Sequence, residues 1–231
     1  MSPPDRLARP ARPPGRYPLL VFDWDGTLVD SVGSIVACMH ATTDALGLPR
    51  IPEATIRETI GLGLQDTLQA LLPEADATLR VRVVECYRDH WLASWADRHA
   101  MIAGARATLD RLRGAGYRLA VATGKSRRGL ERDLERFGLR ELFLATRTVD
   151  EVPAGKPSPR MVQEILAELD VACRDALVVG DTPHDLRMAA GAGVGAVAVA
   201  SGSGERWLLE TLEPLALLPD VTHLPGWLDG A

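Results

Sequence analysis

The chain reads Leu19-Leu20-Val21-Phe22-Asp23-Trp24-Asp25-Gly26-Thr27 near its start, and this stretch predicts both a strand and a chemical site. Four apolar residues predict a short buried strand, and two carboxylates follow it two positions apart. Side chains at positions i and i+2 of an extended backbone lie on the same side, so Asp23 and Asp25 are expected to converge. Like charges that close repel unless a cation or a proton lies between them. We therefore expect a divalent metal ion at the end of this strand.

The composition of the 231 residues is that of an ordinary globular protein. Apolar residues make up 46% and charged residues 25%, which argues against the disordered and membrane-spanning classes. A net charge of −5 gives no electrostatic footprint for nucleic acid. The three cysteines lack CxxC spacing, which argues against a disulfide framework or a zinc site. We expect a soluble, cytoplasmic monomer or homodimer without a nucleic-acid or membrane partner, with residues 1–16 as a flexible lead-in.

The hydrophobic periodicity divides the remaining sequence into two regions. The first has helical spacing and no convincing strand before Ala103, and its expected helices are Val32–Leu46, Pro52–Ile60, Leu64–Leu72 and Asp76–Trp95. In the second, strands alternate with helices. Its expected strands are Tyr117–Thr123, Leu142–Ala145, Ala176–Gly180 and Gly195–Ala200, and its expected helices are Arg127–Phe137, Pro159–Leu169 and His184–Ala190.

This alternation predicts an α/β fold, with a Rossmann-like parallel sheet core covered by helices on both faces. We expect the core domain to comprise residues 17–31 and 104–231, with an all-helical cap domain inserted at residues 32–103. The tail after Ser201-Gly202-Ser203-Gly204 is expected to pack on the core as a helix.

Polar residues follow several of the expected strands. In parallel sheets, ligands bind beyond the carboxyl ends of the strands. Thr123 and Gly124 end one strand, and Asp181 follows another, so these residues are expected to meet Asp23 and Asp25 at one edge. Magnesium prefers such oxygen ligands, which makes Mg²⁺ the expected cofactor.

Three further features of this edge could serve a phosphate group or support the metal. The Thr123-Gly124 segment offers a hydroxyl and backbone N–H groups before a helix, where anions are favoured. Lys156, between Gly155 and Pro157, offers a compact positive charge. Asp185 is expected to cap a helix or to contact a metal-bound water. A local hydrogen-bonding role for Thr123 and a solvated lysine remain open alternatives.

The order of these motifs resembles that of the haloacid dehalogenase superfamily of phosphatases. The sequence has DxDGT, a strand ending in threonine, lysine before proline, and an apolar strand followed by GDxxxD, and the resemblance extends from about Leu19 to Ala200. The resemblance implies that Asp23 is the nucleophile and Asp25 the general acid and base. An aspartate at the position of Asp25 is absent from the dehalogenases of this superfamily, which disfavours dehalogenation.

The same resemblance implies roles for the other motif residues. Thr123 and Lys156 would orient the phosphoryl group, and Asp181 would help to hold magnesium. The inserted helices resemble the mobile cap of the phosphoglycolate phosphatase group, with hinges near residues 31–34 and 102–104. Gly61, Leu62 and Gly63 match a loop that faces the site in those relatives, but a plain interhelical turn is an equal alternative.

The resulting hypothesis is a magnesium-dependent phosphatase that hydrolyses a small phosphorylated metabolite, similar to phosphoglycolate, through an aspartyl phosphate. A sugar-phosphate phosphomutase or pyrophosphatase of the same superfamily, and a non-catalytic module that binds phosphate esters, are the alternatives. Arg57 and Gln65 are expected either to contact the substrate or to be exposed helix residues. Trp24 is expected to turn away from the carboxylates into packing, and His184 either to occupy a variable loop position or to touch the substrate.

Overall fold

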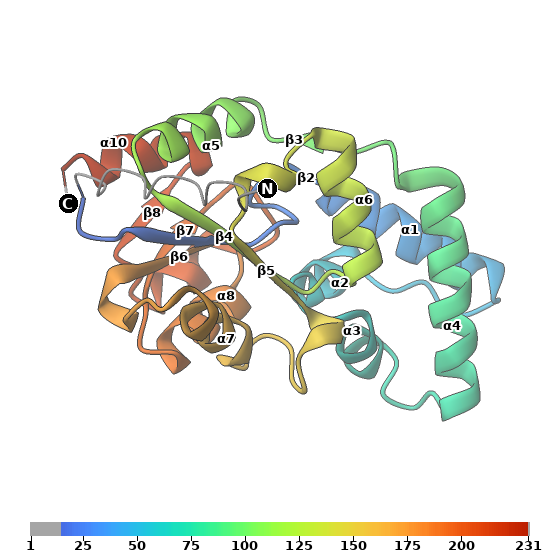
Figure 1. Ribbon diagram of the computed structural model, residues 1–231. Coiled ribbons are helices and arrows are strands. Elements are labelled where there is room, and N and C mark those ends of the chain that lie inside the picture. The colour runs from blue at the N-terminus through green and yellow to red at the C-terminus, as the bar shows by residue number, and fades with distance from the viewer. Residues whose placement is uncertain (1–14, 231) are drawn as a thin grey trace, which may run out of the picture.

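The computed structural model describes residues 15–230, which form a sheet domain and a helical cap at one end of it (Figure 1). Residues 1–14 of the expected lead-in lie outside this range. The main sheet has the order β5-β4-β1-β6-β7-β8 with every neighbouring pair parallel, which confirms the predicted α/β class. Its strands are β1 (Leu19–Phe22), β4 (Arg118–Thr123), β5 (Ala145–Thr148), β6 (Ala176–Gly180), β7 (Gly195–Val199) and β8 (Ala216–Leu218).

Strand β1 lies at the point where the strand order reverses, between β4 and β6. Its last residue, Phe22, is level with Val121 of β4 and Val179 of β6. The backbone N–H of Asp23 then donates to the Val179 carbonyl at 2.9 Å, so the residues that follow β1 and β6 come together. This is the position where sheets of this kind bind their ligands.

Helices cover both faces of the sheet, because successive β1 side chains point to opposite sides. Leu20 and Phe22 pack in one apolar cluster, and Leu19 and Val21 pack in the other. The first face carries α5 (Ala105–Gly114), α6 (Arg127–Phe137) and α10 (Leu224–Leu228), and the second carries α7 (Arg160–Leu169) and α8 (Pro183–Gly191). A further helix, α9 (Arg206–Glu210), packs beside α8.

The cap has an apolar cluster of its own, which includes Val36, Ile56 and Leu68. Its helices are α1 (Val32–Ala45), α2 (Glu53–Thr59), α3 (Leu64–Leu71) and α4 (Ala77–His90). Helix α4 continues into a π-helical turn, Trp91–Trp95, where a single helix was expected. Among residues 15–230, no helix combines the length and the apolar character that a membrane span requires.

Two short strands, β2 (Val29–Asp30) and β3 (Ala100–Met101), pair antiparallel where the chain passes between core and cap. The expectation of an insert without strands is therefore wrong at its end. Two residues are too few to show a period of two, and this pairing depends on residues about 70 positions apart.

Three elements of the core differ from those expected from the sequence. The strand expected at Leu142–Ala145 is β5, which begins at Ala145 after a 3₁₀ turn at Arg140–Leu142. The tail is not one helix, because β8 pairs with β7 between α9 and α10. Helix α5 was not expected at all, since its arginines dilute a narrow buried stripe that includes Leu109 and Leu112.

Candidate active site

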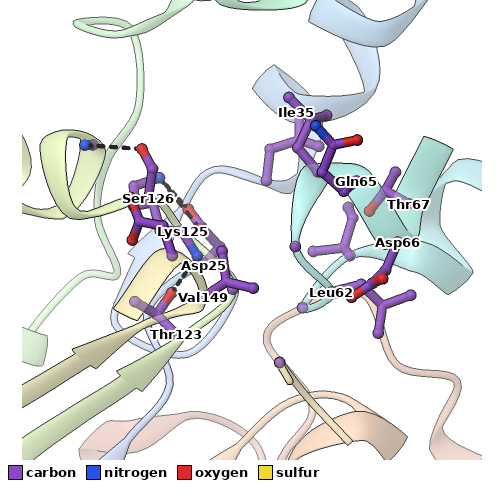
Figure 2. Close-up of a pocket in the computed structure, with 18 of the residues that line it drawn as sticks. Asp25, Ile35, Leu62, Gln65, Asp66, Thr67, Thr123, Lys125, Ser126 and Val149 are labelled. Carbon is purple, nitrogen blue, oxygen red and sulfur yellow. Dashed lines mark hydrogen bonds and ion pairs between the residues drawn. The ribbon is translucent and has the colours of Figure 1, made fainter. Parts of the chain in front are cut away.

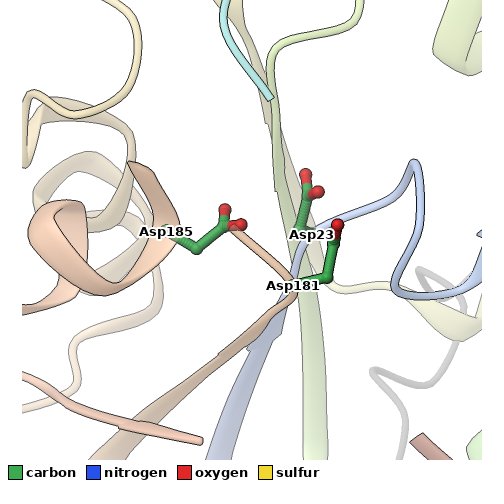
Figure 3. A group of neighbouring side chains, drawn as sticks. All are labelled: Asp23, Asp181 and Asp185. Carbon is green, nitrogen blue, oxygen red and sulfur yellow. The ribbon is translucent and has the colours of Figure 1, made fainter. Parts of the chain in front are cut away.

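Three buried carboxylates meet beyond the ends of β1 and β6 (Figure 3). They belong to Asp23, Asp181 and Asp185, and one oxygen from each lies within 4.8 Å of the others. We call these three side chains the carboxylate trio. Asp23 and Asp181 follow central strands, and Asp185 lies in the first turn of α8, so the parallel topology itself brings them together.

Asp181 is held by donors on both of its oxygens. The Thr27 hydroxyl donates to Oδ1 at 2.8 Å, and the backbone N–H of Ser203 donates to Oδ2 at 2.9 Å. A Cβ at Gly202 would lie 1.8 Å from the same Oδ2, so this loop can only wrap so closely around the carboxylate without a side chain. Burial, together with the charge of Asp185, raises the pKa of Asp181 to about 7.

Lys156 provides the positive charge within the trio. Its ammonium contacts Asp23 Oδ1 and lies 2.6 Å from Asp185 Oδ1, and the side chain is fully buried. Burial alone would lower the pKa of Lys156, but these two carboxylates raise it above its ordinary value. The lysine is therefore charged and fixed in the site, which excludes the solvated alternative for this structure.

Asp23 is buried and only partly satisfied. Burial raises its pKa well above the ordinary value, Lys156 opposes this, and Asp185 and Asp181 add to it. Its Oδ2 is buried and finds no hydrogen-bond partner among residues 15–230. Three carboxylates around one ammonium leave negative charge that a cation would offset, and their hard oxygen donors fit a divalent ion such as Mg²⁺.

Asp185 caps the helix that carries it. Its Oδ2 accepts from the Thr182 N–H at 3.0 Å and from the Thr182 hydroxyl at 2.7 Å, and the Thr182 hydroxyl in turn accepts from the Asp185 N–H. This reciprocal capping box is the first of the two roles expected for Asp185. Its Oδ1 faces Lys156, so the residue both caps the start of the helix and contacts the lysine.

The Asp25 carboxylate does not join the trio. Its Oδ1 accepts from the Ser31 hydroxyl at 2.6 Å and from the Lys125 ammonium at 3.0 Å. The expected convergence with Asp23 assumed extended backbone, but β1 ends at Phe22 and the chain turns through Gly26, whose φ is +85°. The two aspartates of the motif thus have different partners in this structure, Lys156 for Asp23 and Ser31 with Lys125 for Asp25.

Thr123 and Gly124 lie where β4 ends, against the cap. The Thr123 side chain is 1% exposed, and its hydroxyl accepts from the backbone N–H of Lys125 at 3.2 Å. A Cβ at Gly124 would lie 2.4 Å from the Gly61 carbonyl oxygen and 2.6 Å from that of Leu62. The cap loop therefore packs directly on the backbone that leaves β4, which favours the site-facing interpretation of this loop over a plain turn.

Gly63 completes this contact between cap and core. A Cβ there would lie 2.5 Å from the Val149 side chain, beyond β5. Two polar contacts also join the domains. Arg57 donates to the Gly202 carbonyl at 3.3 Å, and His184 Nε2 lies 3.0 Å from the Glu58 carbonyl oxygen. Arg57 and His184 thus hold the cap against the core in this structure.

A cavity of about 1640 Å³ lies between the two domains (Figure 2). Asp25, Thr123 and Lys125 line its core side, and Gln65 and Ile35 line its cap side. The trio's Asp23 and Lys156 also border the cavity, so the carboxylates can be reached from it. Its walls combine polar groups at the sheet edge with aliphatic and aromatic side chains of the cap.

Lys125 and Asp133 are two site residues that the sequence did not single out. Lys125 contacts Asp25 and lines the cavity, and its only sequence signal is its place two residues after Thr123. Asp133 lies on the buried face of α6 and accepts from Trp24 Nε1 at 3.0 Å. Trp24 itself is buried and packs edge-on against Phe143, which confirms that it turns away from the carboxylates.

The family model described as haloacid dehalogenase-like hydrolase matches residues 20–199. The chain belongs to this family. It is a hydrolase, as the resemblance of its motifs predicted, and the match covers all four motifs that carry that resemblance.

The chain is similar to several named members of this family. It is 33% identical to the protein named "Probable phosphatase IndB" from Dickeya dadantii, over 90% of this chain and 92% of that protein. It is 25% identical to the phosphoglycolate phosphatase of Psychrobacter arcticus, over 91% of this chain and 95% of that one. A hydrolase structure from Pseudomonas syringae superposes with a TM-score of 0.83 at 25% identity, over 91% of this chain and 97% of that one.

Proposed function

We propose that the chain is a magnesium-dependent phosphatase that hydrolyses a small phosphomonoester through an aspartyl phosphate on Asp23. The observation that carries this proposal is the Oδ2 of Asp23, which is buried and has no hydrogen-bond partner among residues 15–230, on a residue that contacts Lys156 and borders the cavity. The names of the relatives, which are phosphatases or phosphoglycolate phosphatases, support the same reaction class. A nucleophile needs such a free oxygen, and a structural carboxylate does not.

The residues at the strand ends fit a bound Mg²⁺. Asp23 and Asp181 would hold it, and Asp185 would support it from the outside while it fixes Lys156. The expectation of a metal ion between Asp23 and Asp25 also made Asp25 a ligand, but its carboxylate lies with Lys125 and Ser31 in this structure. When bound, the ion supplies positive charge that offsets the repulsion between Asp23 and a phosphoryl group.

The roles of the chain's own residues follow from their positions. Asp23 attacks phosphorus in line with the leaving oxygen, while Lys156 and the backbone N–H groups after Thr123 hold the other phosphoryl oxygens. Asp25 donates a proton to the leaving alcohol. It then takes a proton from a water molecule, which cleaves the aspartyl phosphate and restores Asp23.

The leaving alcohol would lie in the cavity against the cap loop Gly61-Leu62-Gly63 and Gln65. Phosphoglycolate is the first substrate to test, because several relatives are named phosphoglycolate phosphatase. The cavity volume is larger than such a two-carbon ester requires, so larger phosphorylated metabolites belong in the same panel. A cytoplasmic location and a monomeric or homodimeric state remain predictions.

The test is a panel of phosphate esters assayed for released phosphate, with Mg²⁺ and with EDTA. We expect release that depends on Mg²⁺ for at least one ester, and none from Asp23→Asn. Activity that persists in EDTA would contradict the metal role. Isomer formation without phosphate release would indicate a mutase, release only from pyrophosphate a pyrophosphatase, and binding without turnover a non-catalytic module.

A further inference from the structure

Lys125 lies at the centre of a second cluster of charged side chains. Its ammonium is 3.0 and 3.2 Å from the two oxygens of Asp25 and 3.5 Å from Asp133 Oδ2. It also lies 5.3 Å from the centre of the Trp91 ring, which belongs to the π-helical turn of the cap. One cation therefore contacts Asp25, core helix α6 and the cap at the same time.

Asp133 fixes this lysine from the core side. Its side chain is 3% exposed, and it accepts from Trp24 Nε1 at 3.0 Å in addition to its contact with Lys125. Burial alone would raise the pKa of Asp133, but its contacts with His99 and Lys125 lower it below the ordinary value. The carboxylate is thus a stable anion with partners on both oxygens, and Trp24 ties it to the segment that carries Asp25.

His99 joins this anion to the cap. Its fully buried ring has Nε2 3.4 Å from Asp133 Oδ1, and its Nδ1 lies 3.3 Å from the Trp95 carbonyl oxygen. The ring also stacks on Trp91, with centroids 5.5 Å apart. Both ends of the Trp91–Trp95 turn therefore contact this cluster, and π-helical turns of this kind are frequent at functional sites.

We infer that Lys125, Asp133 and His99 are positioning residues, which hold the Asp25 carboxylate in place and connect that position to the cap turn Trp91–Trp95. This inference rests on the proposed function, because it concerns the residue assigned as general acid and base. A general acid is effective only within hydrogen-bonding reach of the oxygen that it protonates. A displacement of Trp91 would move Lys125, and Lys125 contacts both oxygens of Asp25, so the cap's position acts on proton transfer.

The surrounding charges support a dedicated arrangement over a chance surface pair. Lys125 is 11% exposed, whereas the cation of a simple surface pair, Arg206 with Glu210, is 68% exposed. Surface pairs of that kind contribute little to stability or function. Burial alone would lower the pKa of Lys125, but Asp25 and Asp133 raise it above its ordinary value, so the lysine stays charged.

The test compares two esters that differ in how much they need a proton. Phenyl phosphate has a basic leaving group, whereas 2,4-dinitrophenyl phosphate leaves without protonation. With enzyme in excess over ester, we expect Lys125→Met to slow the first release of phenol by about 10²- to 10³-fold. Release of dinitrophenolate should slow by less than about 5-fold, because that step needs no general acid. Arg206→Met is the matched control, and it should change neither rate.

The outcomes separate this inference from the proposed function. A wild-type enzyme that releases neither phenol nor dinitrophenolate would contradict the phosphatase proposal itself. An active wild type with Lys125→Met slowed equally for both esters would overturn the positioning role, because a purely structural or phosphate-binding lysine gives that result.

Two further variants keep the test decisive if Lys125→Met is poorly folded. Trp91→Leu changes only the cap turn, and it should reproduce the preference for the activated ester to a smaller extent. Lys125→Arg retains the charge and should restore part of the phenyl phosphate rate. Failure of both to show the difference between esters would equally overturn the inference.

Discussion

The carboxylate trio and the Lys125 cluster each contain one aspartate of the DxD motif, and their charges are arranged in opposite ways. In the trio, three carboxylates share one ammonium, and Asp23 keeps a buried oxygen without a partner among the described residues. In the cluster, Asp25 and Asp133 have donors on each side. The proposed metal ion would offset the charge of the first region, whereas the carboxylates of the second find their donors among residues 15–230.

The largest predicted effect is that of Asp23→Asn, which replaces the proposed nucleophile in the carboxylate trio. Asparagine retains the shape but cannot attack phosphorus, so we expect turnover to fall by about 10⁴-fold or more. Burial and neighbouring carboxylates raise the pKa of Asp23, so the ionised form costs stability and the variant's Tm should equal or exceed that of wild type without metal. Asp44→Asn, at a surface residue paired with Arg50, is the control for both measurements. Wild-type turnover in Asp23→Asn would exclude Asp23 as nucleophile.

The second largest effect is expected from Gly202→Ala, which acts on the trio through Asp181. The new Cβ would lie 1.8 Å from Asp181 Oδ2, so the carboxylate or its loop must move. We expect the Mg²⁺ concentration for half-maximal activity to rise about 10- to 100-fold, as for changes to residues that orient metal ligands. Gly33→Ala meets no atom within 4 Å and should leave this concentration unchanged. An unaltered Mg²⁺ requirement in Gly202→Ala would show that Asp181 does not hold the metal.

The corresponding change in the second region is Asp133→Asn, which removes the anion beneath Lys125. Because a buried hydrogen bond to a charged group is lost, we expect a loss of about 2 kcal/mol in the free energy of unfolding, measured with urea. The Mg²⁺ requirement should not change, since Asp133 is not part of the trio. A raised Mg²⁺ requirement would mean that the two regions are not independent.

The sequence predicts the parts of these two regions that depend on local pattern, and it does not predict those that depend on contacts between residues far apart in the chain. β1 and β6 are apolar runs buried on both faces, so their ends, and with them Asp23 and Asp181, could be placed from local pattern. Strands β5 and β8 lie at the sheet edges, where β5 reads Ala145-Thr146-Arg147-Thr148 and β8 is only three residues long and half-buried.

The direction of the Asp25 side chain was not predictable from local pattern. It depends on the turn at Gly26 and on Lys125, one hundred residues later. Asp133 likewise acquires its role only when α6 packs over Trp24. The trio follows from the strand topology, which a single sequence indicates well. The Lys125 cluster follows from tertiary packing, which a single sequence does not indicate.

The smallest predicted effect is a difference in how pH changes the stability of the two regions, measured as Tm between pH 5 and 8 in EDTA. Burial and Asp185 raise the pKa of Asp181 from 3.8 to about 7, so its protonated form favours folding. That contribution is complete below pH 4 and is lost as the pH rises through 7. The Tm advantage of Asp181→Asn over wild type should therefore grow between pH 5 and pH 8, by ~5 °C.

Saturating Mg²⁺ should cancel this difference at pH 8, because an ion that binds only the folded wild type raises its Tm.

The effect of pH on the contribution of Asp133 to stability should have the opposite sign. Burial would raise the pKa of Asp133, but His99 and Lys125 lower it below the ordinary value. The ionised Asp133 therefore stabilises the fold at any pH above that ordinary pKa, and this stabilisation is lost only at lower pH. The Tm deficit of Asp133→Asn should hence stay constant from pH 5 to 8 and be insensitive to Mg²⁺. If the two variants instead responded alike to pH and to the metal, the trio and the cluster would form a single electrostatic unit.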